Sequence, residues 1–145
     1  MCRVVLITDP LEDLPALPCY SAVVACGFPS PAAEYEEVPL DLSEHLVRRP
    51  AATFYVRFAG SSMVGAGIHE GDLGVVDRSM RPGNGDVVVA ILDGDLVCKR
   101  LVRRGPQILL QSDPPAGKPI ALTEGAELTI WGVVVHVIHS LRQAG

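Results

Sequence analysis

The pattern of hydrophobic and polar positions changes near residue 41. Before that point, short apolar patches alternate with six of the chain's twelve prolines. Each proline removes a backbone donor and disfavours helix, so an extended N-terminal arm is expected here. A short helix is expected over 41–49, because acidic residues open this segment, arginines close it and a proline follows.

After residue 50 the pattern is that of short β-strands separated by Gly- and Asp-rich turns. The clearest turn is Asp93-Gly94, a two-residue hairpin signal between β-forming residues. The pattern therefore predicts a mostly β core with one short helix and an extended arm. The expected strands cover 53–59, 73–77, 86–92, 95–102, 107–111 and 128–138.

Composition limits the classes of protein that fit. The chain has 145 residues, of which 48% are hydrophobic, enough for one modest domain with a core. A net charge of -5 argues against direct DNA binding and against an anionic membrane as partner. No apolar run reaches the roughly 18 residues of a membrane span, and the start is unlike a signal peptide. A cytoplasmic protein is therefore expected.

The first candidate for chemistry is Ser62, in the stretch Gly60-Ser61-Ser62-Met63. A serine beside a glycine is by itself more often a turn or cap residue than a nucleophile. Lys99 changes this view, because a neutral lysine can activate a serine without histidine, metal or cofactor. The tight turn could also supply the backbone donors that a developing oxyanion needs.

The choice of lysine at position 99 is informative. Ten of the twelve basic residues are arginine, and the two lysines are Lys99 and Lys118. A general base must be able to lose its proton, which a desolvated lysine can do and arginine cannot. In a strand, Lys99 would share a face with Val97 and Leu101, which would desolvate it. The opposite face is equally mixed, so a surface lysine in a hairpin fits the periodicity as well.

The segment around Cys26 and Gly27 is a candidate target for this pair. Its residues are small and proline-flanked, which suits an extended peptide bound in a narrow cleft, although the same residues also suit an ordinary loop. Ser62 would attack the carbonyl carbon of Cys26 while Lys99 takes the serine proton and passes it to the amine of Gly27.

The other polar candidates carry less chemistry. The histidines show no metal-binding spacing, and core or edge roles are expected for them. Asp72 and Asp77 are expected to shape a turn. The cysteines lack C-x-x-C spacing, so no metal site, redox pair or cofactor is predicted. The histidines are His45, His69, His136 and His139, and the cysteines are Cys2, Cys19, Cys26 and Cys98.

Taken together, these stretches resemble the UmuD proteins of the bacterial SOS mutagenesis system, within the LexA-type family of self-cleaving serine peptidases. The resemblance covers about 125 residues in one register, while the first sixteen residues match nothing in the family. Position 61 is serine where UmuD proteins often have aspartate. The matching stretches are Leu17 to Tyr20, Cys26 to Tyr35, Gly60 to Met63, Gly71 to Leu73, Gly85 to Ala90, Asp93-Gly94, Lys99 and Trp131 to Ile138.

The resemblance implies a fold and a set of roles. It implies a LexA/signal-peptidase-like β-rich core, cleavage between Cys26 and Gly27, Ser62 as nucleophile, Lys99 as general base, and an oxyanion hole formed by the backbone of Ser61 and Ser62. The domains expected are a removable arm over 1–26, a linker over 27–42 and a peptidase and dimerisation domain over 43–145.

The resemblance also implies partners. A RecA filament on single-stranded DNA would stimulate cleavage, and the shortened homodimer would serve a UmuC-type error-prone polymerase in translesion synthesis. A LexA- or phage-type repressor is a weaker alternative, because 26 mostly extended residues before the cut cannot form a DNA-binding domain. A signal peptidase would carry a membrane anchor. A non-catalytic interaction module remains the other alternative.

Overall fold

A computed structural model of the chain describes residues 2–6, 16–20, 27, 37–122 and 128–142. The chain divides into two compact units. One unit combines residues 1–10 with residues 49–145, and the other spans residues 11–48.

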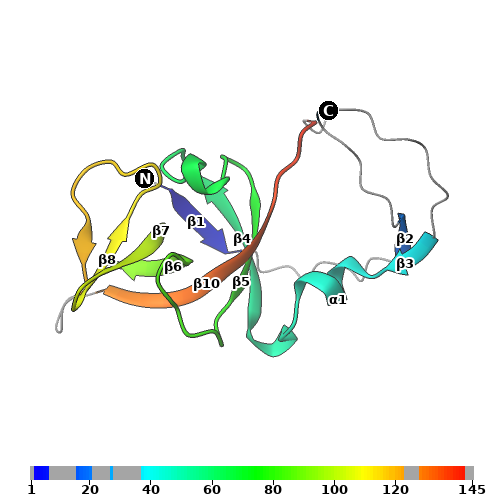
Figure 1. The fold of residues 1–145 in the computed structure, drawn as a ribbon, viewed down its shortest axis with the longest axis horizontal. Helices are drawn as coiled ribbons and strands as arrows, with labels where there is room; N and C mark the ends of the chain where they lie inside the picture. Colours follow the sequence, from blue (N-terminus) through cyan, green and yellow to red (C-terminus); the bar gives the residue numbers. More distant parts are fainter. Residues whose placement is uncertain (1, 7–15, 21–26, 28–36, 123–127, 143–145) are drawn as a thin grey trace. The chain divides into compact units, whose positions relative to one another are not determined.

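The larger unit is built on an eight-stranded sheet that closes on itself (Figure 1). Six strands close the ring because β1 pairs with β4 on one side and with β7 on the other, and β8 and β9 extend it beyond β7. Closure leaves the strands of the ring without open edges. The order is β1 (Arg3–Leu6), β4 (Thr53–Ala59), β5 (Leu73–Asp77), β10 (Leu128–Ile138), β6 (Val87–Leu92), β7 (Asp95–Arg104), β8 (Gln107–Gln111) and β9 (Ile120–Ala121).

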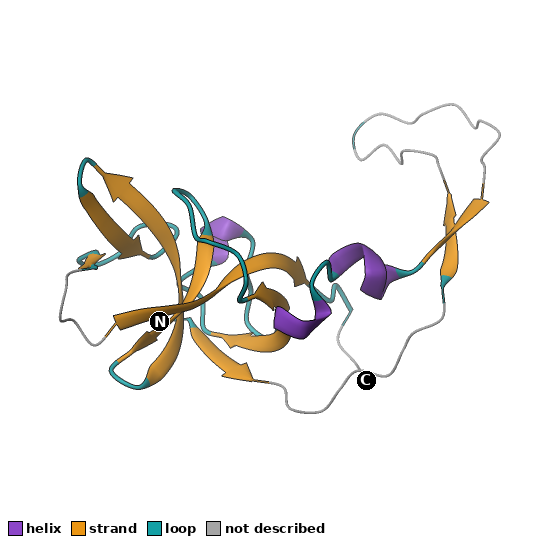
Figure 2. Ribbon diagram, turned by 90° about the horizontal axis from the view of Figure 1, so that it is seen from below, coloured by secondary structure: helices purple, strands orange, loops and turns teal. Residues whose placement is uncertain are grey.

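The longest strand, β10, joins two parts of this barrel. Its first half pairs with β6 and its second half with β5, with shifts of register between Ile130 and Gly132 and between Val134 and His136. Bulges of this kind increase bending and twist. Figure 2 shows the strands curving around the barrel, with the loops at their ends.

Two groups of buried residues fill the barrel unit. The first contains Cys2 and Val4 from β1 and its flank, packed with Phe58, Met63 and Cys98. The second contains residues of β6, β7, β8 and β10, among them Val88, Val97, Leu101, Leu110 and Val133. Successive residues of β7 therefore point into different groups, which explains why its two faces looked equally mixed in the sequence.

Most strand boundaries agree with the sequence pattern, and the mostly β fold with a short helix is confirmed. The Asp93-Gly94 hairpin is confirmed as well, since both residues have positive φ, 49° and 85°, as a two-residue turn between twisted strands requires. Short 3₁₀ turns lie at Pro50–Ala52 and Val64–Ala66.

The smaller unit contains a two-stranded ribbon of β2 (Leu17–Tyr20) and β3 (Glu37–Leu40), followed by α1 (Leu42–Leu46). The side chain of Asp41 accepts a hydrogen bond from the backbone N–H of Glu44 at 3.2 Å, which caps the helix. None of the helix residues is buried. The helix expected over 41–49 is thus present but shorter.

The first residues depart from the expected extended arm. Strand β1 pairs with β4 of the barrel. Val4 within the strand and Cys2 just before it are buried. Proline content indicated the extended backbone correctly, but a four-residue extended segment can pair with a sheet wherever an edge is open. No helix of the described residues is long and apolar enough to cross a membrane.

Candidate active site

Ser62 lies in the loop between β4 and β5, three residues after β4 ends. Gly60 turns the chain there with φ of 96°, a conformation that favours glycine. Met63 is fully buried and anchors the loop. The Oγ atom of Ser62 is buried and has no hydrogen-bond partner among the described residues. A buried hydroxyl without a partner is costly, and such groups often mark functional positions.

Lys99 lies in the middle of β7, between β6 and β8. Its side chain is buried, with 8% of the residue exposed. The Nζ atom donates a hydrogen bond to Oγ of Ser112, which is also buried, over 3.0 Å. Of the two positions that the sequence allowed for Lys99, a desolvated one and an exposed one, the structure has the desolvated one.

The segment 112–113 contacts both candidate residues. Ser112 receives the hydrogen bond from Lys99, and the backbone N–H of Asp113 donates to the carbonyl oxygen of Ser62 over 3.1 Å. The N–H of Gly65 in turn donates to the carbonyl of Asp113 over 2.8 Å. A Cβ atom at Gly65 would lie 2.8 Å from the carbonyl carbon of Asp113, so glycine permits this close approach. The loop that carries Ser62 is thus held by backbone hydrogen bonds to Asp113, the residue that follows Ser112, and Ser112 is the hydrogen-bond partner of Lys99.

Lys99 and its neighbour Arg100 have contrasting surroundings. Arg100 forms an ion pair with the carboxylate of Asp113 at 2.8 Å, and both side chains are partly exposed. Within the described part of the chain, Lys99 has no carboxylate at ion-pair distance, and its recorded partner is a neutral hydroxyl. The two neighbouring cationic side chains therefore differ both in burial and in the chemistry of their partners.

The other expected site residues are placed less completely. The backbone N–H groups of Ser61 and Ser62 have no acceptor among the described residues, as oxyanion donors require. Gly27 is an exposed bend. Cys26 lies outside the described residues, so the structure does not test the expected cleavage position.

Two sets of residues were missed by sequence reasoning. Ser112 could have been found from the hairpin register, because Arg100 pairs with Gln111 and the next pair is therefore Lys99 with Ser112. The second set is His69, Asp72 and His139, which the fold brings together although 67 positions separate Asp72 from His139. No spacing rule along the chain could have found it.

The family of the chain is shown by comparison with known proteins. Residues 18–135 match the Peptidase S24-like family. Protein SamA of Salmonella typhimurium is 47% identical over 134 residues, covering 92% of this chain and 91% of that protein. Protein ImpA of Escherichia coli is 43% identical over 133 residues, covering 91% of this chain and 90% of that protein.

A repressor of the same family is also similar. LexA repressor 1 of Geobacter sulfurreducens is 37% identical over 136 residues, which cover 93% of this chain but 65% of the repressor. The similarity to SamA and ImpA extends over nearly the whole length of those two proteins, whereas about a third of the repressor lies outside the region that aligns with this chain. The chain therefore belongs to the Peptidase S24-like family of serine peptidases and self-cleaving proteins, and within it is a UmuD-like protein of the SOS mutagenesis type.

Proposed function

We propose that this chain cuts its own peptide bond between Cys26 and Gly27, with Ser62 as nucleophile and Lys99 as general base. The observation that carries the proposal concerns Oγ of Ser62, which is buried and has no hydrogen-bond partner in the part of the chain that the structure describes. Its loop is hydrogen-bonded to the segment whose Ser112 accepts from Nζ of Lys99. A serine and a buried lysine in such surroundings have the parts of a two-residue hydrolytic site.

The first half of the reaction forms an acyl-enzyme. Neutral Lys99 turns its Nζ from Ser112 toward Ser62 and takes the Oγ proton as that oxygen attacks the carbonyl carbon of Cys26. The backbone N–H groups of Ser61 and Ser62 stabilise the oxyanion. The proton then passes from Lys99 to the nitrogen of Gly27, and the bond between Cys26 and Gly27 breaks.

The second half restores the site. Lys99 takes a proton from a water molecule while the oxygen of that water attacks the carbonyl carbon of the ester that joins Cys26 to Ser62. The ester bond breaks, Ser62 Oγ regains a proton from Lys99, and Cys26 leaves with a new carboxylate. Because the target is part of the same polypeptide, each molecule needs to be cut once, and the site acts as a switch.

The cut would separate an arm over 1–26 from a linker over 27–42 and a peptidase and dimerisation domain over 43–145. We propose that the shortened protein forms a homodimer and acts in the cytoplasm as an accessory subunit of a UmuC-type error-prone polymerase. A RecA filament on single-stranded DNA would stimulate the cut, without direct DNA binding by this chain. Membership in the UmuD-like group supports these partners.

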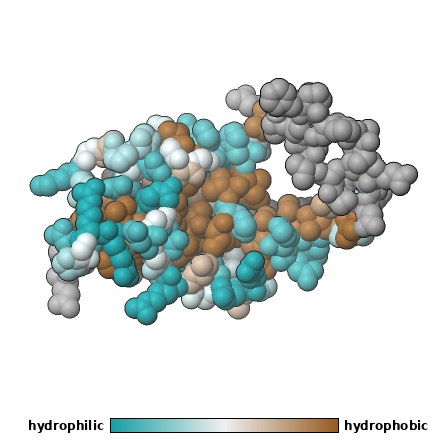
Figure 3. Space-filling view, viewed as in Figure 1, coloured by the Kyte–Doolittle hydropathy of each residue, from teal (hydrophilic) through white to brown (hydrophobic). Residues whose placement is uncertain are grey.

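The surface of the barrel is compatible with a second copy as partner. Figure 3 shows apolar side chains gathered on the face where β10 crosses β4 and β5. Phe54 is 41% exposed and Ile138 is 38% exposed, and the ring of Phe54 lies 5.4 Å from that of Trp131. Exposed apolar patches of this kind are typical of protein interfaces.

Intact mass measured over time tests the proposed cleavage. Purified full-length protein is incubated at alkaline pH, and separately with RecA, single-stranded DNA and ATP. We expect loss of residues 1–26 in the wild type, with the rate lowered by about 10³-fold or more in Ser62→Ala and Lys99→Ala. Ser140→Ala and Lys118→Ala, which change an exposed serine and the other lysine, serve as matched controls that cut at the wild-type rate.

The outcomes separate the alternatives. Wild-type protein that stays full length under both conditions refutes the peptidase proposal and favours a non-catalytic interaction module. Cleavage that persists in Ser62→Ala and Lys99→Ala refutes the roles assigned to these two residues and indicates that other groups of the chain carry out the self-cleavage.

Ser112 is expected to position Lys99. Ser112→Ala removes the hydroxyl that holds Nζ, and we expect cleavage to slow by about tenfold because the amine is less well oriented. Ser112→Thr keeps a hydroxyl at this place and should recover most of the rate. Equal rates for the alanine and threonine variants, with equal stability in urea, would show that the hydroxyl does not position the lysine.

A further inference from the structure

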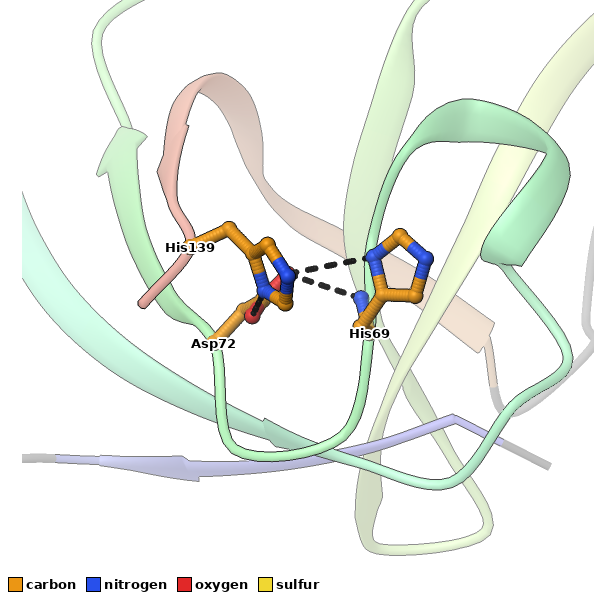
Figure 4. Close-up of side chains that lie close together, drawn as sticks. All are labelled: His69, Asp72 and His139. Atoms are coloured by element: carbon orange, nitrogen blue, oxygen red, sulfur yellow. Dashed lines mark hydrogen bonds and ion pairs between the residues drawn. The ribbon is translucent and has the colours of Figure 1, made fainter. Parts of the chain in front are cut away.

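A second cluster of chemically active side chains lies at the other end of the loop that carries Ser62. It consists of His69 in the loop before β5, Asp72 immediately before β5, and His139 immediately after β10 (Figure 4). One ligand atom from each of the three lies within 4.8 Å of the other two. Nothing in the proposed cleavage uses these residues.

Asp72 is held in place as a ligand would be. Its residue is 2% exposed, its N–H donates to the carbonyl of His69 over 3.1 Å, and its carbonyl accepts from the N–H of Phe58 over 2.9 Å. The carboxylate accepts a hydrogen bond from the N–H of His69 at 2.8 Å through Oδ2. Its other oxygen, Oδ1, lies 2.6 Å from Nδ1 of His139. The backbone of His69 therefore holds one carboxylate oxygen, and the ring of His139 contacts the other.

The two imidazoles are placed side by side over this carboxylate. Their ring centroids are 4.7 Å apart, and Nδ1 of His69 lies 3.8 Å from Oδ2 of Asp72. The side chains of His69 and His139 are 51% and 42% exposed, so both rings can turn and solvent can reach them. Two protonated imidazoles at this separation would repel each other, whereas two neutral imidazoles can share one cation.

The donor set selects the class of cation. Two imidazole nitrogens and one carboxylate oxygen suit Zn²⁺ and its neighbours Co²⁺, Ni²⁺ and Cu²⁺, while Ca²⁺ and Mg²⁺ prefer six or more oxygen ligands. Ligands of a tetrahedral zinc ion are about 3.3 Å apart, so small rotations of the exposed rings would complete the geometry. The ion would take the place of the hydrogen bond between Oδ1 of Asp72 and Nδ1 of His139.

We propose that His69, Asp72 and His139 form a binding site for a divalent transition-metal ion, and we take Zn²⁺ as the ion to be tested. The three protein ligands leave a fourth position for water. Because the ligands come from the loop before β5 and from the residue that follows β10, the ion would tie the end of the last strand to the loop that carries Ser62. The site thereby links metal binding to the stability of the barrel.

Calorimetric titration of the full-length protein, freed of any polyhistidine tag, with ZnCl₂ tests this site. We expect one ion per chain and a rise in Tm of several degrees on saturation, as for any ligand that binds only the folded state. Each of His69→Gln and His139→Gln should weaken binding by at least about tenfold, and the double variant should abolish the stoichiometric step. His136→Gln, which changes another exposed histidine on β10, is the matched control and should bind like the wild type.

Cobalt substitution gives a second readout that does not depend on stability. Co²⁺ bound by these ligands should give the visible absorption of a low-coordinate site, absent from the double variant and present in His136→Gln. Zinc binding that is equal in the wild type and the double variant would assign the ion to other groups, such as exposed cysteine, and would overturn the proposal. A wild type without saturable binding would show that the cluster is only an ion pair between Asp72 and its histidines. Neither outcome depends on self-cleavage, since Ser62→Ala protein can be used throughout.

Discussion

Two short strands from the first forty residues, β1 and β2, have opposite surroundings. Both are four residues long and rich in apolar side chains. Strand β1 lies between β4 and β7, with Val4 8% exposed and its neighbour Cys2 fully buried. Strand β2 pairs with β3, and Leu17 and Val38 of this ribbon are 65% and 57% exposed.

The burial of these short strands therefore depends on the strands beside them and not on their apolar content. Strand β1 meets two strands with unpaired edges and closes the barrel, so Val4 and the preceding Cys2 enter a core. A two-stranded ribbon has no second layer of its own and is marginally stable in water. If the proposed cut occurs, the removed fragment therefore contains a strand that the barrel uses.

A charge placed in β1 and one placed in the ribbon of β2 and β3 should have very different effects on stability. Val4→Asp should destabilise the barrel by about 4 kcal/mol or more, because the carboxylate would be buried without a partner. Val38→Asp is the matched change at an exposed position and should stay within about 0.5 kcal/mol. Urea unfolding followed by the fluorescence of Trp131, the chain's single tryptophan, measures the barrel.

A milder pair keeps this test informative if Val4→Asp does not fold. Val4→Ala should cost about 1–2 kcal/mol and Val38→Ala close to nothing. Equal midpoints for the two variants would contradict the burial of β1.

Thiol labelling sharpens the comparison without mutation. Cys19 on β2 is exposed, whereas Cys2 and Cys98 are buried together where β1 meets β7. We expect maleimide to label Cys19 at least about 100-fold faster, because the buried pair reacts only when the barrel opens. Peptide mass mapping during a time course measures the rates. The same experiment on cleaved protein asks whether β1 stays, since Cys98 would become reactive once the strand leaves.

The two buried thiols also differ from each other. A hydrogen bond from Cys98 lowers the pKa of Cys2, while the same bond and burial raise the pKa of Cys98 well above its usual value. In a local opening that exposes the pair without separating it, Cys2 should therefore react before Cys98, because the thiolate is the reactive form. Faster labelling of Cys98 than of Cys2 would contradict this contact.

The smallest expected effect concerns acid. Hydrogen bonds from Ser79, together with Arg49 at 3.1 Å, lower the pKa of the buried Asp77 carboxyl in the barrel. A lowered folded pKa gives stability that is present above the unfolded value near 4 and is lost as the pH falls through the folded value. Barrel stability should thus fall below about pH 4, and Asp77→Asn should flatten that slope.

The acid test again separates the two units. Signals from the ribbon of β2 and β3, such as the reactivity of Cys19, should not follow the Asp77 transition. An unchanged slope of barrel stability between wild type and Asp77→Asn would assign acid sensitivity to other carboxylates.

The local elements and the candidate pair could be predicted from the amino-acid sequence. Strand limits, the Asp93-Gly94 turn and the short helix depend on neighbouring residues, through periodicity, turn conformation and capping, so they can be predicted from a window of sequence. Ser62 and Lys99 could be named because few residue types can serve as nucleophile and base.

The contacts between distant elements follow from the folded barrel. Its closure by β1 and the meeting of Asp72 with His139 join residues whose order along the chain carries no trace of the contact. Lys99 is the clearest example. Both faces of its strand have a mixed composition, and its side chain is buried because β7 lies between β6 and β8 in the folded sheet. Long-range contacts depend on how twisted strands close a sheet, and a local pattern does not encode that closure.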